Sequence, residues 1–202
     1  MALEVWWIRH AQSEWNQKLR WQGHSDPPLS EEGRGQSLRL RERLEGEPFD
    51  RVYTSDLKRA AMTRQLALPA CQAIVDPRLR EICFGRFEGR THEELDADEQ
   101  ALCFAWFRDP FGSRIPEGES MSDLSERVGG WFQELPASGR VAVFTHGGVI
   151  RWALWRITGP PVNGSWSVDL DNASITRIAY HASRVRVLTV NDTHGLRNGP
   201  AS

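Results

Sequence analysis

Short apolar runs alternate along this chain with segments of helical pattern, and this alternation restricts the fold more than any other feature. The runs expected to be strands are Leu3 to Ile8, Arg51 to Thr54, Ala73 to Val75, Val141 to Thr145, Ile175 to Tyr180 and Arg184 to Val190. Strands that are separated by helices form mainly parallel sheets with helices on both faces. The last two runs are joined only by the residues His-Ala-Ser, which predicts a C-terminal hairpin. We therefore expect a three-layer α/β/α sandwich.

The helical segments carry start and stop signals. Ser30 precedes the run EEGRGQSLRLRERL, which has acidic residues first and basic residues last, as the helix dipole favours. Residues 57–68 predict a shorter helix. Ser120 and Asp123 form a capping-box-like start to a third helix, and GGVIRWALWRITG follows the fourth strand directly, ending at Gly159 and two prolines. The apolar stripe of the third helix is predicted to be core: Met121, Leu124, Val128, Trp131, Phe132 and Leu135.

Length and composition favour one globular domain. The chain has 202 residues, of which 40% are hydrophobic and 26% charged, and it has no low-complexity tract. A domain of this size buries roughly 70% of the surface that its unfolded chain exposes. With no linker or internal repeat in the sequence, we expect a single domain over residues 1–197 and a loose tail over residues 198–202.

Charge, cysteines and hydropathy exclude several classes of protein. The net charge of −2 argues against general binding to nucleic acid or to a membrane surface. Cys71, Cys83 and Cys103 are odd in number and far apart, so neither a disulfide framework nor a zinc knuckle is predicted. No stretch approaches the roughly 18 apolar residues of a membrane span, and the N-terminus lacks a signal-peptide pattern. We expect a cytoplasmic protein, and the sequence leaves a homodimer open.

Reactive side chains follow three of the predicted strands. Arg9 and His10 end the first strand, Arg59 follows the second, and His146 and Gly147 follow the fourth. Because ligands in open α/β sheets gather outside the carboxyl ends of the strands, we expect both imidazoles and both guanidiniums to face one hollow. Such a cluster favours an anion, and arginine forks suit phosphate oxygens. Two predicted helices, beginning near Gly148 and Lys58, would add backbone N–H donors.

Each of these segments alone has an ordinary structural explanation, and only their conjunction is specific. The stretch RHAQSEWN resembles the signature of the histidine phosphatase superfamily, also called the phosphoglycerate mutase-like family. The resemblance continues in order through WQGHSDPPLSEEGRGQ, VYTSDLKRAAMT, RLREICFGRFEG, PEGES, VAVFTHGGVIR and NDTHGL. It is strongest to the bacterial broad-specificity and α-ribazole-phosphatase-like branch, whose members are phosphoric monoester hydrolases.

The resemblance assigns a role to each site residue. It implies that His10 is the nucleophile, that Arg9, Arg59 and His146 hold the phosphoryl group, and that Glu81 is the proton donor. Further residues match positions that line the substrate pocket in the family: Asn16, Gln22, Gly23 and Gly147. A neutral His10 would attack phosphorus, and arginines with a protonated His146 would stabilise the equatorial oxygens. Glu81 would then act as acid in the first half-reaction and as base in the second.

The remaining histidines and the acidic run HEELDADEQ have simpler explanations. His24, His92, His181 and His194 lie in polar surroundings, so we expect loop or surface positions, although His24 follows Gln22 and Gly23 and could touch a ligand. The acidic run matches no metal-ligand spacing and predicts a solvated helix. We expect no metal and no cofactor, with a small phosphomonoester as substrate.

Departures from the family pattern separate the candidate reactions. Ala11 and Gln12 replace the usual glycine and glutamate, and we expect the small alanine to be tolerated. Cofactor-dependent phosphoglycerate mutases carry Arg-His-Tyr after the proton donor, whereas this chain has Ile82, Cys83 and Phe84. A second anion pocket is therefore not predicted, which favours hydrolysis over the mutase alternative. A catalytically silent phospho-ligand-binding module is the second alternative, but it would be expected to lack His10 or Glu81.

Aromatic residues are frequent in the segment that follows Glu81. We interpret them as a lid that suits a bulky, less polar phosphomonoester, while ordinary core packing explains them equally well. The aromatic residues concerned are Trp15, Trp21, Phe84, Phe87, Phe104, Trp106, Phe107 and Phe111.

Overall fold

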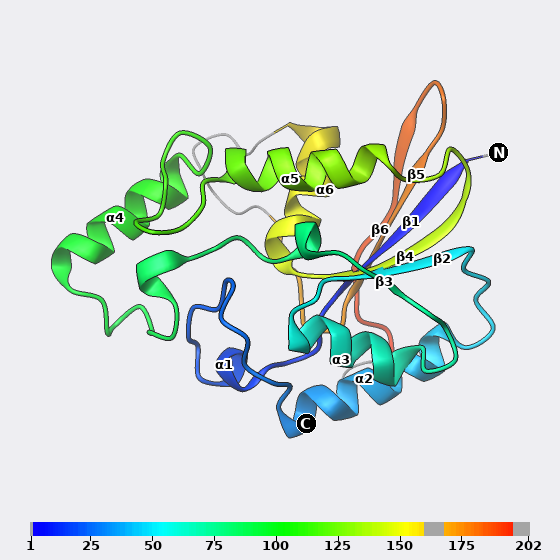
Figure 1. The fold of residues 1–202 in the computed structure, drawn as a ribbon, viewed down its shortest axis with the longest axis horizontal. Coiled ribbons are helices and arrows are strands. Elements are labelled where there is room, and N and C mark those ends of the chain that lie inside the picture. The colour runs from blue at the N-terminus through cyan, green and yellow to red at the C-terminus, as the bar shows by residue number, and fades with distance from the viewer. Residues whose placement is uncertain (1, 160–167, 196–202) are drawn as a thin grey trace.

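The computed structural model describes residues 2–159 and 168–195, and in these ranges the chain forms a six-stranded sheet with helices on both faces (Figure 1). The strand order is β3-β2-β4-β1-β5-β6. The strands are β1 (Leu3–Arg9), β2 (Arg51–Thr54), β3 (Ile74–Val75), β4 (Gly139–Thr145), β5 (Ile175–Tyr180) and β6 (Val185–Asp192).

The pairing of the strands confirms the predicted sheet. Strands β3, β2, β4 and β1 are parallel neighbours, while β5 pairs antiparallel with β1 and β6 pairs antiparallel with β5. The hairpin β5–β6 turns at His181, whose backbone exchanges hydrogen bonds with Arg184. The sheet is therefore mainly parallel, with the expected C-terminal hairpin.

Six α-helices are described, and the four predicted ones lie close to their expected bounds. Ser30 and Ser120 cap α2 and α5 as the sequence indicates, each by accepting a backbone N–H with its side chain. Gly159 ends α6 with φ of 79°, a conformation that favours glycine. The helices are α1 (Glu14–Gln17), α2 (Glu31–Leu44), α3 (Lys58–Ala67), α4 (Ala97–Arg108), α5 (Met121–Gln133) and α6 (Gly147–Thr158), with 3₁₀ turns at Pro77–Leu79 and Gly85–Phe87.

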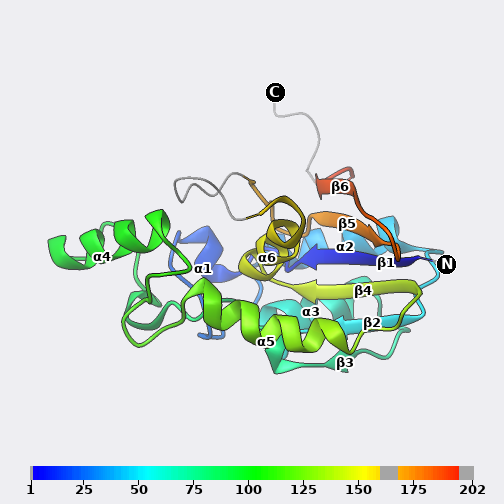
Figure 2. The same cartoon turned by 90° about the horizontal axis from the view of Figure 1, so that it is seen from above.

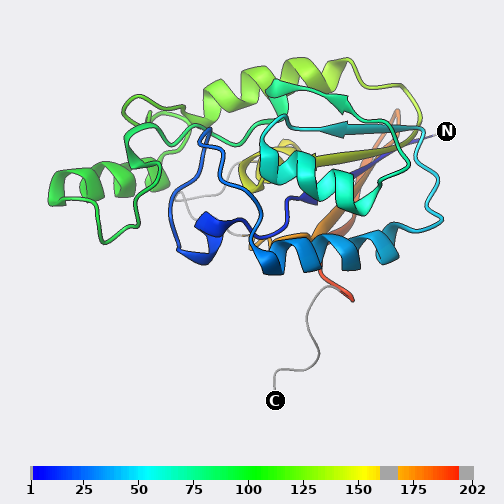
Figure 3. The same ribbon diagram turned by 60° about the horizontal axis from the view of Figure 1, so that its bottom comes forward.

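Alternate residues of the central strands enter two different cores. Val5 and Trp7 of β1 pack with the apolar faces of α5 and α6, whereas Trp6 and Ile8 pack with α2 and α3. Along β4 the same alternation places Val143 in the core with α5 and α6, and its neighbours Ala142 and Phe144 in the core with α2 and α3. Figure 3 shows α5 on one side of the sheet and α2 on the other. This period-2 pattern produces the predicted three layers.

The register of the parallel strands determines where the candidate site lies. Arg9, the last residue of β1, is paired with Thr145, the last residue of β4, and the backbone N–H of His10 donates to the carbonyl of Thr145 at 2.9 Å. The arrowheads of β1 and β4 point toward the end of the molecule that carries α1 and α4 (Figure 2). His10 and His146 are thus adjacent because their strands end in register.

The sequence analysis missed one helix and misplaced the start of another. The short helix α1 was not predicted, and the helix in the acidic run begins only at Ala97, where Asp96 forms a capping box with Glu99. The predicted loose tail and the two prolines after Gly159 lie outside the described residues. Within the described ranges, every helix is too short or too polar to cross a membrane.

Candidate active site

His10 is buried directly after β1, and its ring is held in one tautomer. Its Nδ1 lies 2.7 Å from the carbonyl oxygen of Ala11. A carbonyl oxygen only accepts, so Nδ1 carries the proton and Nε2 of the neutral ring keeps its lone pair. Burial, together with the charges of Arg59 and Arg9, lowers the pKa of His10 well below its ordinary value. His10 is therefore a neutral imidazole with a defined nucleophilic nitrogen.

His146 lies beside His10, with 5.1 Å between the ring centroids. It is fully buried, and its Nε2 is 2.9 Å from the hydroxyl oxygen of Ser55. Its Nδ1 has no hydrogen-bond partner among the described residues. Burial and the charge of Arg59 lower the pKa of His146 well below its ordinary value. A ring buried beside two arginines is therefore neutral in the ligand-free protein, and the protonation of His146 that the sequence predicts for phosphoryl transfer stays a prediction.

Two arginines provide fixed positive charge next to these rings. Arg59 is completely buried, and its guanidinium donates to the carbonyls of Ser25 at 2.9 Å and Gly23 at 2.8 Å. Arg9 donates to the carbonyl of Leu170, and its Nε has no partner among the described residues. Burial lowers the pKa of each to about 10, so both stay charged at neutral pH. The hydrogen-bond partners of these arginines are neutral carbonyls, although the charge of Glu81 acts on both guanidiniums. Two guanidiniums bound to neutral groups can attract an anion.

The carboxylate of Glu81 lies at the start of α6, where the sequence analysis expected backbone N–H groups to bind the phosphate of the substrate. Its carboxylate accepts the backbone N–H of Gly148 at 2.9 Å, in the first turn of α6, and that of Ile82 at 2.9 Å. At the start of α3, Asp26 accepts the N–H of Lys58 at 2.6 Å. One backbone N–H at each of these two helix starts, that of Gly148 and that of Lys58, is therefore not free to bind phosphate in this structure. Both N–H groups already bind carboxylates, which the positive ends of the helix dipoles favour.

Arg127 of α5 holds the backbone that carries Glu81. Its guanidinium donates to the carbonyls of Arg80 and Glu81, each at 2.8 Å, and to the carboxylate of Glu119 at 2.8 Å. Glu119 in turn accepts the backbone N–H of Cys83. The sequence analysis did not single out Arg127 or Glu119. Glu119 lies in the quoted PEGES motif, but nothing in the spacing indicates a partner on α5.

A second brace holds the loop on the Arg59 side. The carboxylate of Glu88 accepts the backbone N–H groups of His24 at 2.9 Å, Ser25 at 2.6 Å and Phe84 at 3.0 Å. These hydrogen bonds hold the pKa of Glu88 below its ordinary value, although burial opposes them. A Cβ on Gly23 would lie 2.5 Å from the carbonyl oxygen of Ile82. Glycine at this position therefore permits the close approach of the two loops.

The polar residues predicted to line the pocket form one hydrogen-bonded group. Asn16 Oδ1 accepts from the backbone N–H of Ser13, and Gln22 Oε1 accepts from the hydroxyl of Ser13 at 2.6 Å. The side chain of Asn172 donates to the His10 carbonyl at 3.2 Å and to Asn16 Oδ1 at 3.3 Å. Asn172 was missed by the sequence analysis. These residues brace the loop beside the nucleophile.

Two of the remaining predicted residues lie next to Glu81. They are Gly147 and His24. A Cβ on Gly147 would lie 2.9 Å from the guanidinium of Arg151 and within 3.8 Å of both Glu81 and Arg9. His24 is half-buried, and its Nε2 donates to the Glu81 carbonyl, 3.0 Å away. His92 and His194 are exposed, as expected. The structure therefore brings every predicted site residue to the same end of the sheet.

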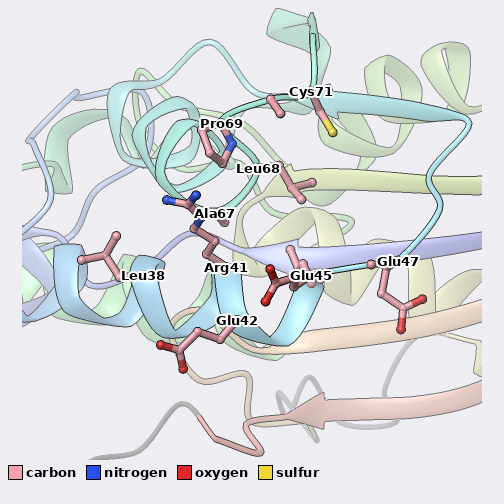
Figure 4. A pocket seen from close by; sticks show the side chains of 12 residues that line it. Leu38, Arg41, Glu42, Glu45, Glu47, Ala67, Leu68, Pro69 and Cys71 are labelled. Atoms are coloured by element: carbon pink, nitrogen blue, oxygen red, sulfur yellow. The ribbon is translucent and has the colours of Figure 1, made fainter.

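A cavity of about 300 Å³ adjoins the site, and a larger hollow lies elsewhere. The cavity is lined by Trp21, Glu81, Ile82, Phe84, Trp106, Phe107, Gly148 and Arg151. The hollow, of about 490 Å³, lies between the last turns of α2 and α3 (Figure 4). Glu47, which lines it, pairs with Arg140 near the start of β4, so the hollow is at the amino ends of the strands. Its position separates it from the buried histidines.

The chemistry of this site suits phosphoryl transfer. It combines a neutral imidazole nucleophile, two fixed guanidiniums and a carboxyl group that faces an adjoining cavity. Such groups can position a phosphoryl group, stabilise its oxygens and move one proton. Within the described ranges, no group of three or more histidine, cysteine or acidic side chains is arranged to hold a metal ion.

Comparison with known families identifies the chain. A family model, the histidine phosphatase superfamily (branch 1), matches residues 5–193. The chain belongs to this superfamily. The histidine phosphatase family and the phosphoglycerate mutase-like fold predicted from the sequence are thus confirmed, and so is the prediction of a phosphatase-type enzyme.

Relatives of this histidine phosphatase carry names of two kinds. The probable phosphoglycerate mutase GpmB of Cronobacter sakazakii is 33% identical over 186 residues, which cover 90% of this chain and 86% of that protein. Bacillus stearothermophilus YhfR aligns with a TM-score of 0.86 and 28% identity, covering 97% of this chain and 100% of its own. The α-ribazole phosphatase from Shigella flexneri aligns with a TM-score of 0.82 and 28% identity, covering 94% of this chain and 96% of its own.

Proposed function

We propose that this histidine phosphatase hydrolyses small phosphomonoesters through a phosphohistidine formed on Nε2 of His10. The observation that carries the proposal is the fixed tautomer of His10, whose Nδ1 lies 2.7 Å from the Ala11 carbonyl. The bond at Nδ1 directs the lone pair of Nε2 away from the backbone. Burial and the neighbouring arginines keep the pKa of the ring low, so the nucleophile is unprotonated at neutral pH.

In the first half-reaction, Nε2 attacks phosphorus and the bond between phosphorus and the ester oxygen breaks. Arg9 and Arg59 neutralise the charge on the equatorial oxygens. Glu81, as a carboxylic acid, gives its proton to the departing alkoxide oxygen. An incoming phosphate dianion offsets the charges of the two arginines, and this favours protonation of the carboxylate before the chemical step.

In the second half-reaction, water attacks the phosphohistidine. Glu81, now a carboxylate, removes a proton from the water as the phosphorus–nitrogen bond breaks. The electron pair of that bond returns to Nε2, and inorganic phosphate leaves. In the free protein the ring of His146 is neutral. While the ligand is bound, the negative charge of the phosphoryl group favours protonation of this ring.

The mutase alternative is favoured by the names of relatives such as GpmB. A phosphoglycerate mutase must retain a carboxylated alcohol while the phosphoryl group returns to a different oxygen. Here the cavity beside Glu81 is lined mostly by aromatic and aliphatic side chains, with Arg151 as the basic residue in its lining. This lining supports hydrolysis over isomerisation. Adding 2,3-bisphosphoglycerate and measuring 2-phosphoglycerate formed from 3-phosphoglycerate separates the two reactions.

A screen of phosphomonoesters in the presence of a chelator tests the proposed function. Wild type is compared with His10→Ala, and His92→Ala serves as a control because His92 is exposed. We expect metal-independent release of phosphate by wild type and His92→Ala, and loss of nearly all turnover in His10→Ala. An inert wild type, or a fully active His10→Ala, would contradict the proposal. An inert protein that still binds phosphate would support a silent binding module instead.

The setting that we propose is the cytoplasm, with a small molecule rather than a nucleic acid as the partner. Cys71, Cys83 and Cys103 are all unpaired thiols, which fits a reducing compartment. The net charge of −2 does not favour a polyanionic partner.

A further inference from the structure

The side chains of the cavity next to Glu81 form an aromatic wall made of Trp21, Phe84, Trp106 and Phe107. Trp21 is 4.9 Å from Phe84 and 5.8 Å from Phe107, measured between ring centroids. Trp106 is 5.7 Å from Phe84 and 5.2 Å from Phe107. The rings meet tilted or edge to face, which is the favourable geometry for aromatic pairs. Three separate segments of the chain thus build one continuous apolar surface.

The structure divides the aromatic residues that the sequence grouped together. Phe87 is buried in the core, Phe104 is 65% exposed, and Phe111 packs against Trp155. Of the eight aromatic residues that the sequence analysis grouped, the four of the aromatic wall line the cavity. Trp106 is fully buried and supports the wall, while Trp21, Phe84 and Phe107 are partly exposed. A surface of partly exposed rings beside a reactive carboxyl group is available to a ligand.

The aromatic wall lies on the side of the site where the leaving group departs. Glu81 and Gly148 line the same cavity, and the carboxylate is fixed at the Gly148 N–H. If Glu81 protonates the ester oxygen, the carbon attached to that oxygen points into the cavity. The alcohol portion of the substrate would then contact the aromatic wall.

The charges in the cavity disfavour a small anionic alcohol. Among the described residues that line it, Arg151 is the one basic residue and Glu81 the one acidic residue. The charge of Arg151 interacts with that of Glu81, and burial lowers the pKa of Arg151. A carboxylate that entered this cavity would lose its water among side chains that are mostly apolar. An uncharged ring loses no such hydration.

We propose that the leaving group of the substrate is a flat, uncharged ring system that stacks on the aromatic wall. This inference rests on the proposed function, since it places the ester oxygen at Glu81. The cavity of about 300 Å³ is at the lower end of the range for ligand sites, which suits a group of one or two rings. Stacking on aromatic side chains adds to the stabilisation from burial of apolar area.

Matched primary alkyl esters test the inference without a large difference in leaving-group basicity. We compare benzyl phosphate and 2-naphthylmethyl phosphate with ethyl phosphate and 3-phosphoglycerate. We expect kcat/KM for the two aromatic esters to exceed that for ethyl phosphate by at least about tenfold, and to exceed that for 3-phosphoglycerate by more. Equal or reversed preference in an active enzyme would overturn the inference and leave the proposed function standing.

Two substitutions on α4 test whether the aromatic wall causes the preference for aromatic over alkyl phosphate esters. We expect Phe107→Ala to reduce the ratio of kcat/KM for benzyl over ethyl phosphate by about tenfold. Phe104→Ala, on the same helix and 65% exposed, is expected to leave the ratio unchanged. A ratio that does not respond to Phe107→Ala would overturn the inference. Phe107→Leu keeps apolar volume and checks that the loss reflects the ring rather than misfolding.

Binding of phosphonates separates failure of the inference from failure of the proposed function. Benzylphosphonate and ethylphosphonate have no ester oxygen and are not hydrolysed, so calorimetry measures binding alone. We expect benzylphosphonate to bind at least about tenfold more tightly, with the difference reduced in Phe107→Ala. If an inactive protein binds benzylphosphonate more tightly than ethylphosphonate, the inferred ring site is supported and the proposed hydrolase activity is rejected. Equal binding of the two compounds would reject the ring site whatever the activity.

Discussion

The carboxylate of Glu81 accepts a hydrogen bond from the backbone N–H of Gly148, with 2.9 Å between Oε1 and the nitrogen. This contact is short because position 148 has no side chain. A Cβ there would lie 2.3 Å from the same carboxylate oxygen. Gly148, in the first turn of α6, therefore determines where the proposed proton donor lies, and it links the helix start to the chemistry.

Gly148→Ala is expected to displace the Glu81 carboxylate and to lower kcat for alkyl phosphates by about 10²–10⁴, the usual contribution of general acid catalysis. The matched control is Gly130→Ala in α5, because a Cβ at position 130 meets open space. Gly130→Ala should retain kcat and raise the free energy of unfolding by about 0.5–1 kcal/mol. Steady-state kinetics and denaturant melts measure both effects. Equal kcat in the two variants would contradict the role given to Gly148.

Glu81→Gln is expected to slow the hydrolysis of phosphate esters, and to slow it more when the leaving group is more basic. Ethyl phosphate requires a proton on its departing oxygen, and its kcat/KM should fall by about 10²–10⁴. 4-Nitrophenyl phosphate releases a stable phenolate that needs no proton. Its kcat/KM should therefore fall far less when formation of the phosphohistidine is the step that determines kcat/KM. Measuring kcat/KM over a series of esters gives the dependence. A loss of the same size for all esters would show that Glu81 positions the substrate rather than donating a proton.

Arg59→Lys preserves the positive charge but removes the planar fork that reaches the carbonyls of Ser25 and Gly23. We expect kcat to fall by about 10²–10³, as for loss of one donor to a transition-state oxyanion, and inhibition by inorganic phosphate to weaken. Lys58→Ala, at the neighbouring exposed position, is the control. Comparable phosphate inhibition in wild type and Arg59→Lys would exclude Arg59 from the anion site.

The two buried histidines should make stability fall at mildly acidic pH. Burial and nearby arginines lower the pKa of His10 and His146 well below the ordinary value of 6.5. Between the lowered pKa and 6.5 the unfolded chain binds more protons than the folded chain, so the free energy of unfolding decreases as pH decreases. Each ring contributes up to about 1.4 kcal/mol per pH unit. Denaturant melts of wild type, His10→Asn and His146→Gln measure the slope, and a slope unaffected by either substitution would refute this assignment.

The fold was largely predictable because its signals are local. The cap at Ser30, the cap at Ser120 and the apolar run before Arg9 each depend on neighbours in sequence, and each predicted element formed there. The parallel pairing of the strands that helices separate follows from the general rules of such sheets. The convergence of Arg9, His10 and His146 was predictable for the same reason, since carboxyl ends of parallel strands share one edge.

The braces of the site were not predictable, because their partners are far apart in sequence. Arg127 binds carbonyls that lie 46 or more residues away, and Glu88 binds N–H groups 63 and 64 residues away. No spacing in the sequence marks such pairs. The depth at which His146 is buried was not predictable either, because it is set by the whole fold.

The structure also explains the two departures from the family signature. The methyl group of Ala11 is fully buried in the core on the side of α2 and α3, and its N–H donates to the Thr63 hydroxyl at 3.0 Å. The side chain of Gln12 accepts from the hydroxyl of Ser30 at 2.7 Å, at the start of α2. Ala11 is thus accommodated as expected, and Gln12 supports the scaffold next to the nucleophile.

The covalent intermediate on His10 is the central claim, and trapping it is the most direct test. The enzyme is mixed with a phosphomonoester that carries a labelled phosphoryl group and is quenched in base, which preserves phosphohistidine, before peptide mapping by mass spectrometry. We predict label on His10 in wild type, and none in His10→Ala. Turnover that proceeds without labelled protein, or label mapped to another residue, would contradict the account.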